Sequence, residues 1–122
     1  KVDLIIRGIF RLRLKLHHKN LRAVSIVDRY LEHARVFYFY AGGKEKMYLG
    51  SADIMRRNLD FRIEVTTPIK NKNHKKTLLD MLRLQLADNS KSRLMFGKLR
   101  NKYSANTEKV VRSQLDFYKS LG

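Results

Sequence analysis

The sequence predicts a layered α/β (α+β) domain in which a mixed β-sheet is flanked by helices. Three observations lead to this fold class. Several short apolar and β-branched runs fit strands, a glycine-containing turn between two of them fits a hairpin, and two stretches have the apolar spacing of helices. The chain has 122 residues, and we expect them to form a single domain, residues 1–122. A mixture of strands and helices in one chain favours layers packed around a sheet.

The first part of the chain predicts two strands. Val2–Ile6 is short and apolar, which fits a buried strand that ends at Arg7 and Gly8. The run Ile9–Leu16 alternates leucine with basic residues and fits either a half-buried strand or a basic loop, and residues 17–20 fit a turn. The second strand is expected over Arg22–Val27.

The middle of the chain predicts a short helical turn and a hairpin. Asp28 is in the position of a cap for a turn over residues 29–33. Val36–Tyr40 is aromatic on both faces, which predicts a central strand buried on two sides. The glycines of residues 41–44 fit a hairpin turn, and Lys46–Leu49 returns antiparallel. A further strand is expected over Phe61–Thr67, before Pro68.

The last third of the chain predicts two helices. Lys72–Leu86 places its leucines on one face, at positions 78, 79, 82 and 86. Residues 87–90 end this helix, and Ser92–Lys102 is basic and irregular. Thr107 is expected to cap the last helix, whose apolar stripe contains Val111, Leu115 and Tyr118.

The charge of the chain indicates a polyanionic partner. Lys and Arg number 27 against 11 Asp and Glu, so the formal net charge is +16. An excess of this size fits nucleic acid, a phosphate polymer, a nucleotide or an anionic membrane, and it also fits an acidic neighbouring domain. The chain has no cysteine, which excludes disulfides and thiolate metal sites. It begins with Lys1 inside an expected strand, and we interpret it as part of a longer protein.

His33 is the main candidate for chemistry. An imidazole titrates near neutral pH, so it can transfer a proton or carry a phosphoryl group. A single histidine is more often structural than catalytic, and its neighbours Glu32 and Arg35 raise the odds only modestly. Arg7, between a strand and Gly8, has the fork geometry that binds phosphate, although its pattern alone favours an ordinary surface arginine.

The segment from Gly50 to Arg62 is rich in small, polar and basic residues. Ser51 and Asp53 fit a tight turn for purely local reasons. Arg56, Arg57 and Arg62 are candidates to line an anion channel, or are solvated. Neither of the glycine-rich phosphate-binding motifs G-x-x-x-x-G-K-[ST] and G-x-G-x-x-G is present. No metal site is predicted.

Long stretches of the chain resemble the C-terminal part of the bacterial polyphosphate kinase family. They are "LIIRG" at residues 4–8, "SIVDRYLEH" at 25–33, "FYFYAGGKEKMYLGSAD" at 37–53, "RRNLDFRIEVTTPI" at 56–69 and "VRSQLDFYKSL" at 111–121. The resemblance covers nearly the whole chain. It implies a phospholipase D-like fold, and this chain resembles the second of two such domains.

The resemblance implies an enzyme that moves the terminal phosphate of ATP reversibly onto inorganic polyphosphate, with Mg²⁺. Arg7 resembles a residue that contacts the nucleotide phosphates, and His33 resembles the second active-site histidine. The histidine that is phosphorylated, and the Mg²⁺ ligands, are expected outside this chain, so this chain alone is expected to be inactive. The resemblance further implies ATP/ADP, polyphosphate and the remaining domains as partners, a homo-oligomer, and a cytoplasmic location with membrane association left open.

Some residues depart from the family pattern. Phe10 and Arg11 stand where the family usually has Cys-Cys, and Ile54, Arg56 and Phe61 replace its usual Trp, Pro and Arg. The phospholipase D pattern is also altered, because residues 33–35 read His-Ala-Arg where that family has His-x-Lys, and residues 50–53 read Gly-Ser-Ala-Asp where it has Gly-Ser-x-Asn. The alternatives are a phosphodiesterase and a non-catalytic basic module that binds polyanions. We do not expect nucleic acid as the primary partner.

Overall fold

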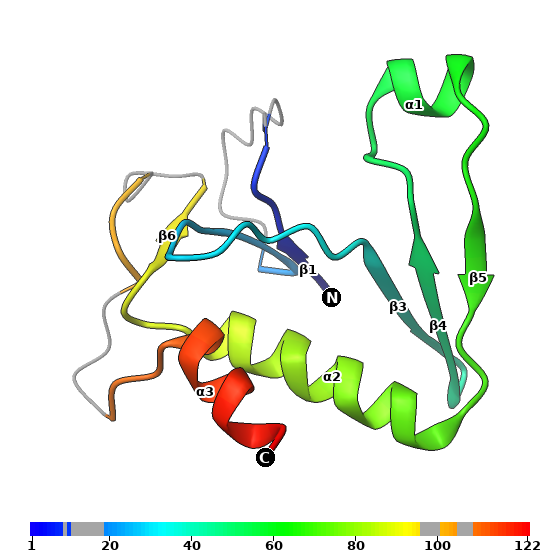
Figure 1. Cartoon of the computed structure of the whole chain (residues 1–122). Helices are drawn as coiled ribbons and strands as arrows, with labels where there is room; N and C mark the ends of the chain where they lie inside the picture. The colour runs from blue at the N-terminus through cyan, green and yellow to red at the C-terminus, as the bar shows by residue number, and fades with distance from the viewer. Residues whose placement is uncertain (9, 11–18, 96–100, 105–108) are drawn as a thin grey trace. The chain divides into compact units, whose positions relative to one another are not determined.

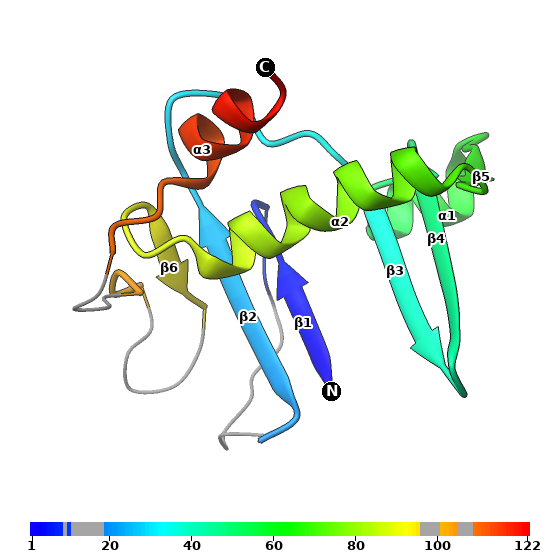
Figure 2. The same cartoon turned by 90° about the horizontal axis from the view of Figure 1, so that it is seen from below.

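The computed structural model describes residues 1–8, 10, 19–95, 101–104 and 109–122. The chain forms two compact units (Figures 1 and 2). The first unit contains Lys1–Glu32 and Asp80–Gly122, and the second unit contains His33–Leu79. No helix in the described residues is long and apolar enough to cross a membrane.

The first unit contains a small mixed sheet with β2 at its centre. The strands β1 (Val2–Ile5), β2 (Leu21–Ile26) and β6 (Ser92–Leu94) lie in the order β1-β2-β6. β2 is parallel to β1 and antiparallel to β6. The side chains of Ala23, Val24 and Ile26 are almost completely buried, so the core of this unit is centred on β2.

The second unit contains an antiparallel sheet of β3 (Val36–Ala41), β4 (Lys44–Gly50) and β5 (Thr66–Pro68), in that order. Gly42 and Gly43 form the turn between β3 and β4 with φ angles of 58° and 77°, a conformation that favours glycine. Met47 is the buried apolar side chain of this sheet, at 3% exposure.

Three helices complete the described structure. α1 (Arg56–Phe61) lies between β4 and β5, and α3 (Ser113–Ser120) lies near the C-terminus. α2 (Lys72–Ala87) begins in the second unit and ends in the first. Its N-terminus is capped by Asn71, whose Oδ1 accepts hydrogen bonds from the backbone N–H groups of Asn73 and His74.

The predicted fold class is confirmed, since strands and helices form a mixed α/β structure. The strands predicted over 2–6, 22–27 and 46–49 correspond to β1, β2 and β4, and the helix predicted over 72–86 corresponds to α2. The strands form two separate three-stranded sheets and not the one sheet that was predicted. Part of the segment predicted to be irregular, residues 92–102, forms β6.

The predicted helical turn over residues 29–33 is wrong, because this segment has no helical structure. Asp28 does not cap a turn. Its carboxylate instead accepts two hydrogen bonds from Arg112, 84 residues away, at 2.9 and 2.7 Å. A local sequence pattern cannot reveal a partner at that separation.

The prediction of Val36–Tyr40 as a central strand buried on both sides is also wrong. Among the residues that the structure describes, β3 pairs only with β4, and Phe39 and Tyr40 are 55% and 66% exposed. Phe39 makes an edge-to-face contact with Tyr48 on β4, with 6.2 Å between ring centroids. Aromatic residues therefore stabilise this edge strand through neighbours on β4.

The strand predicted over Phe61–Thr67 is only partly correct. Phe61 ends α1, where the Arg56–Asp60 ion pair at an i,i+4 spacing supports the helical turn. Only Thr66–Pro68 pairs with β4. Most of Ile9–Leu16, both histidines of residues 17–18, and Thr107 lie outside the described residues.

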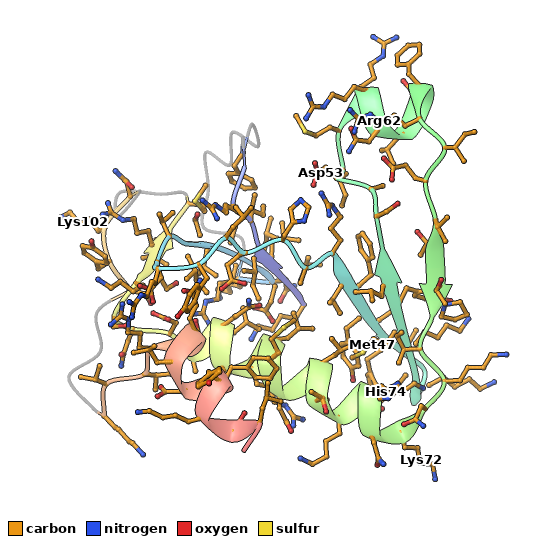
Figure 3. The ribbon with its side chains drawn as sticks, viewed as in Figure 1. Met47, Asp53, Arg62, Lys72, His74 and Lys102 are labelled. Carbon is orange, nitrogen blue, oxygen red and sulfur yellow. The ribbon has the colours of Figure 1, made fainter. Side chains whose placement is uncertain are left out.

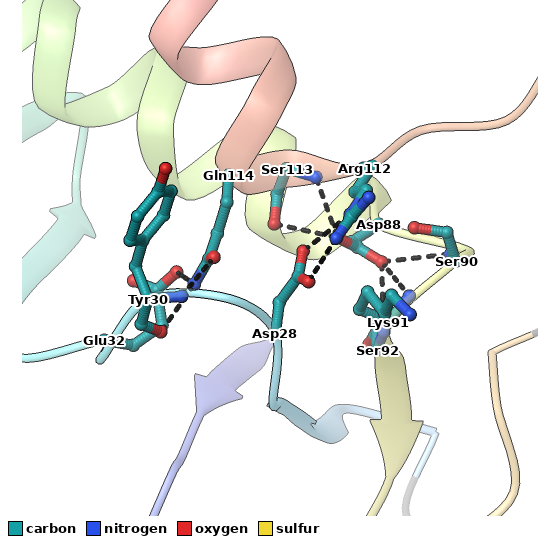
Figure 4. Close-up of polar contacts among 10 residues, drawn as sticks. All are labelled: Asp28, Tyr30, Glu32, Asp88, Ser90, Lys91, Ser92, Arg112, Ser113 and Gln114. Carbon is teal, nitrogen blue, oxygen red and sulfur yellow. Dashed lines mark hydrogen bonds and ion pairs between the residues drawn. The ribbon is translucent and has the colours of Figure 1, made fainter.

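Asp88 connects the end of α2 to β6 and α3 (Figure 4). Its Oδ1 accepts hydrogen bonds from the backbone N–H groups of Ser90, Lys91 and Ser92 at 3.0, 2.7 and 3.0 Å. Its Oδ2 accepts from the N–H and Oγ of Ser113, both at 2.8 Å. Asp88 is 1% exposed. Burial acts to raise its pKa, but these hydrogen bonds outweigh burial and hold the pKa below its usual range.

We predict that Asp88→Ala destabilises the first unit by about 3–5 kcal/mol, because several backbone N–H groups lose a buried charged acceptor. Amide hydrogen exchange of the full-length protein measures this. The amides of Lys91, Ser92 and Ser113 should exchange about 100-fold faster or more. Asp60→Ala, which removes an exposed carboxylate from the second unit, should leave these amides unchanged. Unchanged protection in Asp88→Ala would contradict the role assigned to Asp88.

Acid should weaken the first unit through the same carboxylate and through Asp28. The hydrogen bonds from Arg112 lower the pKa of Asp28 below its usual value. A carboxyl group with a lowered folded-state pKa stabilises the fold above its unfolded pKa of about 4, and this stabilisation is lost as the pH falls through the folded pKa. Exchange of the β6 and α3 amides, corrected for the intrinsic rate, should stay constant from about pH 7 to 5 and rise below about pH 4. A rise centred near pH 6 would implicate a histidine instead.

Candidate functional site

His33 is held by the side chain of Arg35 at the start of the second unit. Arg35 Nη2 lies 3.0 Å from His33 Nε2, and Arg35 Nη1 donates to the His33 carbonyl oxygen at 3.3 Å. A guanidinium has only hydrogen-bond donors, so Nε2 is the acceptor in this contact. In this geometry the imidazole is therefore neutral and carries its proton on Nδ1.

The same guanidinium reaches the turn after β4. Arg35 Nε donates to Asp53 Oδ1 at 2.9 Å, and the Arg35 side chain is only 19% exposed, against 44% for Asp53 (Figure 3). The backbone N–H of Gly50 donates to the Arg35 carbonyl at 2.9 Å, which brings the end of β4 beside the arginine. We call these three side chains the His33–Arg35–Asp53 cluster.

Gly50 allows this close approach of the strands. A Cβ atom at this position would lie 3.2 Å from Thr66 Oγ1 and 3.4 Å from a ring carbon of Phe37. Both neighbours belong to the same sheet, so a larger residue would push the strand ends apart. The glycine thus contributes to the position of the turn that carries Asp53.

The charge of Asp53 is stabilised by its partner. The hydrogen bond from Arg35 is the largest cause of the lowered pKa of Asp53, and the positive charge of Arg35 acts in the same direction. The carboxylate is therefore ionised at neutral pH. It neutralises Arg35 on one side, while the guanidinium keeps its other N–H groups directed at His33.

Ser51 has a structural role in this structure. Its Oγ donates a hydrogen bond to Glu64 Oε2 and accepts one from the backbone N–H of Val65 at 3.1 Å. The backbone N–H of Ser51 also donates to the Val65 carbonyl at 3.0 Å. The hydroxyl therefore joins the two chain segments on either side of α1. This agrees with a local role for the small residues of this turn.

The three arginines predicted to line a channel lie on and directly after α1. Arg56, Arg57 and Arg62 are exposed. Arg56 Nε lies 3.1 Å from Asp60 Oδ2, and the Arg56 side chain is 86% exposed. They belong to the same unit as His33, and the channel itself stays a prediction.

Arg7 belongs to the first unit. It follows β1, whose pairing with β2 is continued by the hydrogen bond from Ile6 N–H to the Val24 carbonyl at 2.8 Å. The side chain is exposed. Arg7 lies in the first unit and His33 in the second, so the position of each is given only relative to its own unit.

The segment that leads into His33 is anchored by polar contacts with α3, shown in Figure 4, and with α2. Gln114 accepts a hydrogen bond from the Tyr30 N–H and donates to the Tyr30 carbonyl, at 2.9 and 2.8 Å. Glu32 accepts from Gln114 and Gln85, at 2.8 and 2.9 Å. Tyr30 is 58% exposed, so hydrogen bonds and not apolar burial hold this segment in place.

Sequence reasoning missed the residues that position His33. Arg35 and Asp53 had each been noted as a departure from the phospholipase D pattern, but not as a pair. The available signal was their place in that pattern, since each stands at a motif position of the pattern. Gln85 and Gln114 gave no signal in the sequence.

The chain is similar to known proteins in sequence and in fold. The family described as "Polyphosphate kinase C-terminal domain 2" matches residues 1–114. Polyphosphate kinases of Exiguobacterium sp. and Escherichia coli K12 are 45% and 44% identical over 126 aligned residues, which include 100% and 98% of this chain. The crystal structure of the polyphosphate kinase from Porphyromonas gingivalis matches with a TM-score of 0.91 at 41% identity, over 98% of this chain.

The chain is much shorter than these relatives. It spans 18% of the length of the Exiguobacterium and Escherichia coli enzymes and 19% of the Porphyromonas gingivalis chain. The match nevertheless extends over nearly every residue of the chain, including both units and the His33–Arg35–Asp53 cluster. The chain belongs to the polyphosphate kinase family, in which it matches C-terminal domain 2.

Proposed function

We propose that the protein containing this chain transfers the terminal phosphate of ATP reversibly to inorganic polyphosphate, and that this chain supplies part of the active site. The observation that carries the proposal is the His33–Arg35–Asp53 cluster, in a chain that belongs to the polyphosphate kinase family. The cluster combines a titratable ring with a partly buried guanidinium whose orientation is fixed by a carboxylate.

The chemistry of the cluster suits phosphoryl transfer. This reaction needs positioned positive charge on the phosphate oxygens more than it needs covalent help. A phosphate oxygen forms a stronger hydrogen bond with Arg35 than a neutral imidazole does. A substrate phosphate would therefore bind Arg35 Nη2 and free Nε2 of His33. This nitrogen would then accept a proton, and its N–H would position the oxygen at which the bond breaks.

The other predicted site residues receive supporting roles. Arg7 would bind a phosphate of ATP or ADP, and Arg56, Arg57 and Arg62 would guide the polyanion. The described residues contain no group of three or more His, Asp or Glu side chains that fits a metal ion. As the family resemblance implies, we place the Mg²⁺ ligands and the phosphorylated histidine elsewhere in the protein.

The proposal also includes the assembly of the full-length protein and its location in the cell. The active site would be completed by the remaining domains of the same chain, and the full-length enzyme would form a homo-oligomer in the cytoplasm. This chain alone would then be inactive.

We predict that the full-length protein incorporates label from ATP labelled on its terminal phosphate into a nuclease-resistant polymer. His33→Ala and Arg7→Ala should each lower kcat about 100-fold or more, because each removes a group that contacts the transferred or adjacent phosphate. Arg83→Ala removes an exposed arginine paired with Asp80 and is the control, with an expected change below twofold.

The possible outcomes test the proposed activity and the role of His33 separately. Normal polymer synthesis by His33→Ala would show that the assigned activity is correct but that His33 does not have the assigned role. Absence of polymer with the wild-type protein, combined with salt-sensitive binding of polyanions, would favour a non-catalytic basic module.

We predict that Arg35→Lys lowers kcat about 10- to 100-fold, because an ammonium cannot contact Asp53 and His33 through separate N–H groups as a guanidinium does. Asp53→Asn should lower kcat about 10-fold by releasing the guanidinium. Since both act through the same group, the double variant should be no slower than Arg35→Lys. A multiplicative effect in the double variant would show that Asp53 acts independently of Arg35.

The ion pair between Arg83 and Asp80 provides a matched control, because it joins the same residue types on an exposed face of α2. Arg83→Lys, Asp80→Asn and their combination should each leave kcat within about twofold of the wild type.

A further inference from the structure

The positive charges of the second unit are sorted by residue type. Its lysines all lie in two segments, the turn-proximal part of β4 and the segment from the end of β5 into α2, at positions 44, 46, 70, 72, 75 and 76. Its arginines all lie near the cluster and α1, at positions 35, 56, 57 and 62. The acidic residues follow the arginines, because only Glu45 lies among the lysines.

The two lysine segments approach each other beside the middle of β4. Tyr48 pairs with Pro68, and the Ile69 N–H donates to the Met47 carbonyl at 2.8 Å, so the same register places Lys46 opposite Lys70. α2 begins two residues later. Lys72, at the start of α2, lies far from Arg62 at the opposite end of this unit (Figure 3).

We call Lys44, Lys46, Lys70, Lys72 and Lys75 the lysine face. Within the described residues, none of their ammonium groups has a hydrogen-bond or ion-pair partner. The nearby Glu45 accepts a hydrogen bond from the Tyr38 hydroxyl at 2.8 Å. The positive potential of this surface is therefore poorly neutralised by the unit's own acidic groups.

This arrangement opposes folding stability. The N-terminus of a helix is its positive end and is stabilised by acidic residues, but the first turn of α2 contains none and begins with lysine. Lysines on opposite strands also repel each other. Residues that cost stability are expected where they serve binding, and a helix N-terminus surrounded by lysines attracts anions.

We propose that the lysine face binds inorganic polyphosphate at a distance from the reacting phosphate and holds the polymer between turnovers. This inference rests on the proposed function. Lysine is a compact, strongly hydrated point charge on a flexible stem, whereas arginine imposes a fork geometry on its partner. A polymer that advances by one phosphate per turnover needs a holding surface that accepts every register, and lysines meet that need.

The distance between the lysine face and Arg35 determines which kinetic constants should change when the lysines are replaced. β4 runs for seven residues from Lys44 to Gly50. At about 3.3 Å per residue, Lys44 lies on the order of 20 Å from the end of the strand beside Arg35, and Lys46 lies about 13 Å from it. A long polymer can contact both ends, whereas the transferred phosphate contacts only one. Loss of the lysine face should therefore raise the KM for long polyphosphate and leave kcat unchanged.

The test uses the full-length protein and a triple variant, Lys44→Gln, Lys46→Gln and Lys70→Gln. Binding of end-labelled long polyphosphate and the KM for the same polymer are measured at several salt concentrations. Binding should weaken at least 10-fold, and the slope of log affinity against log salt should fall by about 2, as for the loss of three contacts with a single-stranded polyanion. The KM for a short oligophosphate should change less than twofold.

Two matched variants isolate position from charge. Replacement of Lys19, Lys109 and Lys119 by Gln removes the same charge from exposed positions of the first unit and should leave binding unchanged. Replacement of Lys44, Lys46 and Lys70 by Arg retains the charge and should restore most of the affinity.

Each outcome decides the inference separately from the proposed function. If the wild type synthesises polymer but the Gln variant binds polyphosphate normally, the lysine face is overturned and the proposed function stands. Equal weakening by the first-unit control would also overturn it, since the effect would then be one of net charge. If the protein binds an RNA of equal charge more tightly than it binds polyphosphate, the lysine face is a nucleic-acid-binding surface and the inference is overturned as well.

Discussion

The first unit depends on one carboxylate, because Asp88 supplies the acceptors for four backbone N–H groups and a hydroxyl at the junction of α2, β6 and α3. Among its described residues, the fully buried apolar side chains are few and lie on β2, so their burial alone gives a small core. A buried carboxylate that satisfies several N–H groups fixes these elements in one arrangement. With α3 in place, Arg112 and Gln114 can bind Asp28, Tyr30 and Glu32, the residues that precede His33.

Carboxylates have the same organising role in the second unit. In a chain with 27 basic and 11 acidic residues, a cation close to His33 would repel its neighbours unless an anion held it. Asp53 does this for Arg35 through a hydrogen bond that leaves the remaining N–H groups directed at the imidazole. The site is thus ordered before substrate arrives, which reduces the reorganisation that charge transfer requires. A substrate phosphate would compete with the imidazole for a guanidinium that is already positioned.

Local patterns predicted the elements that depend on local physics. β2 and α2 follow from runs of apolar residues and from leucine spacing, and the hairpin follows from Gly42 and Gly43. The pairs that build the site join residues 18 and 84 positions apart, namely Arg35 with Asp53 and Asp28 with Arg112, and no period connects them. β3 was misjudged because exposed aromatic residues and buried ones look alike in a sequence. His33 gained weight only through the family resemblance, since a histidine in an irregular segment carries no structural signal of its own.

If the protein carries out the proposed reaction, the division between lysine and arginine in the second unit has a physical reason. Transfer of one phosphate requires fixed angles, which a guanidinium held by a carboxylate provides. Movement of a polymer requires the opposite, because a surface that binds one register tightly would halt the chain after each transfer. Flexible, hydrated ammonium groups bind all registers with similar free energy, so the polymer can shift without crossing a large barrier. Arginines placed at both ends of the unit would make binding stronger and turnover slower. Under the proposed function, the positive charge of the second unit is therefore better understood as two surfaces with different tasks than as one general attraction for anions.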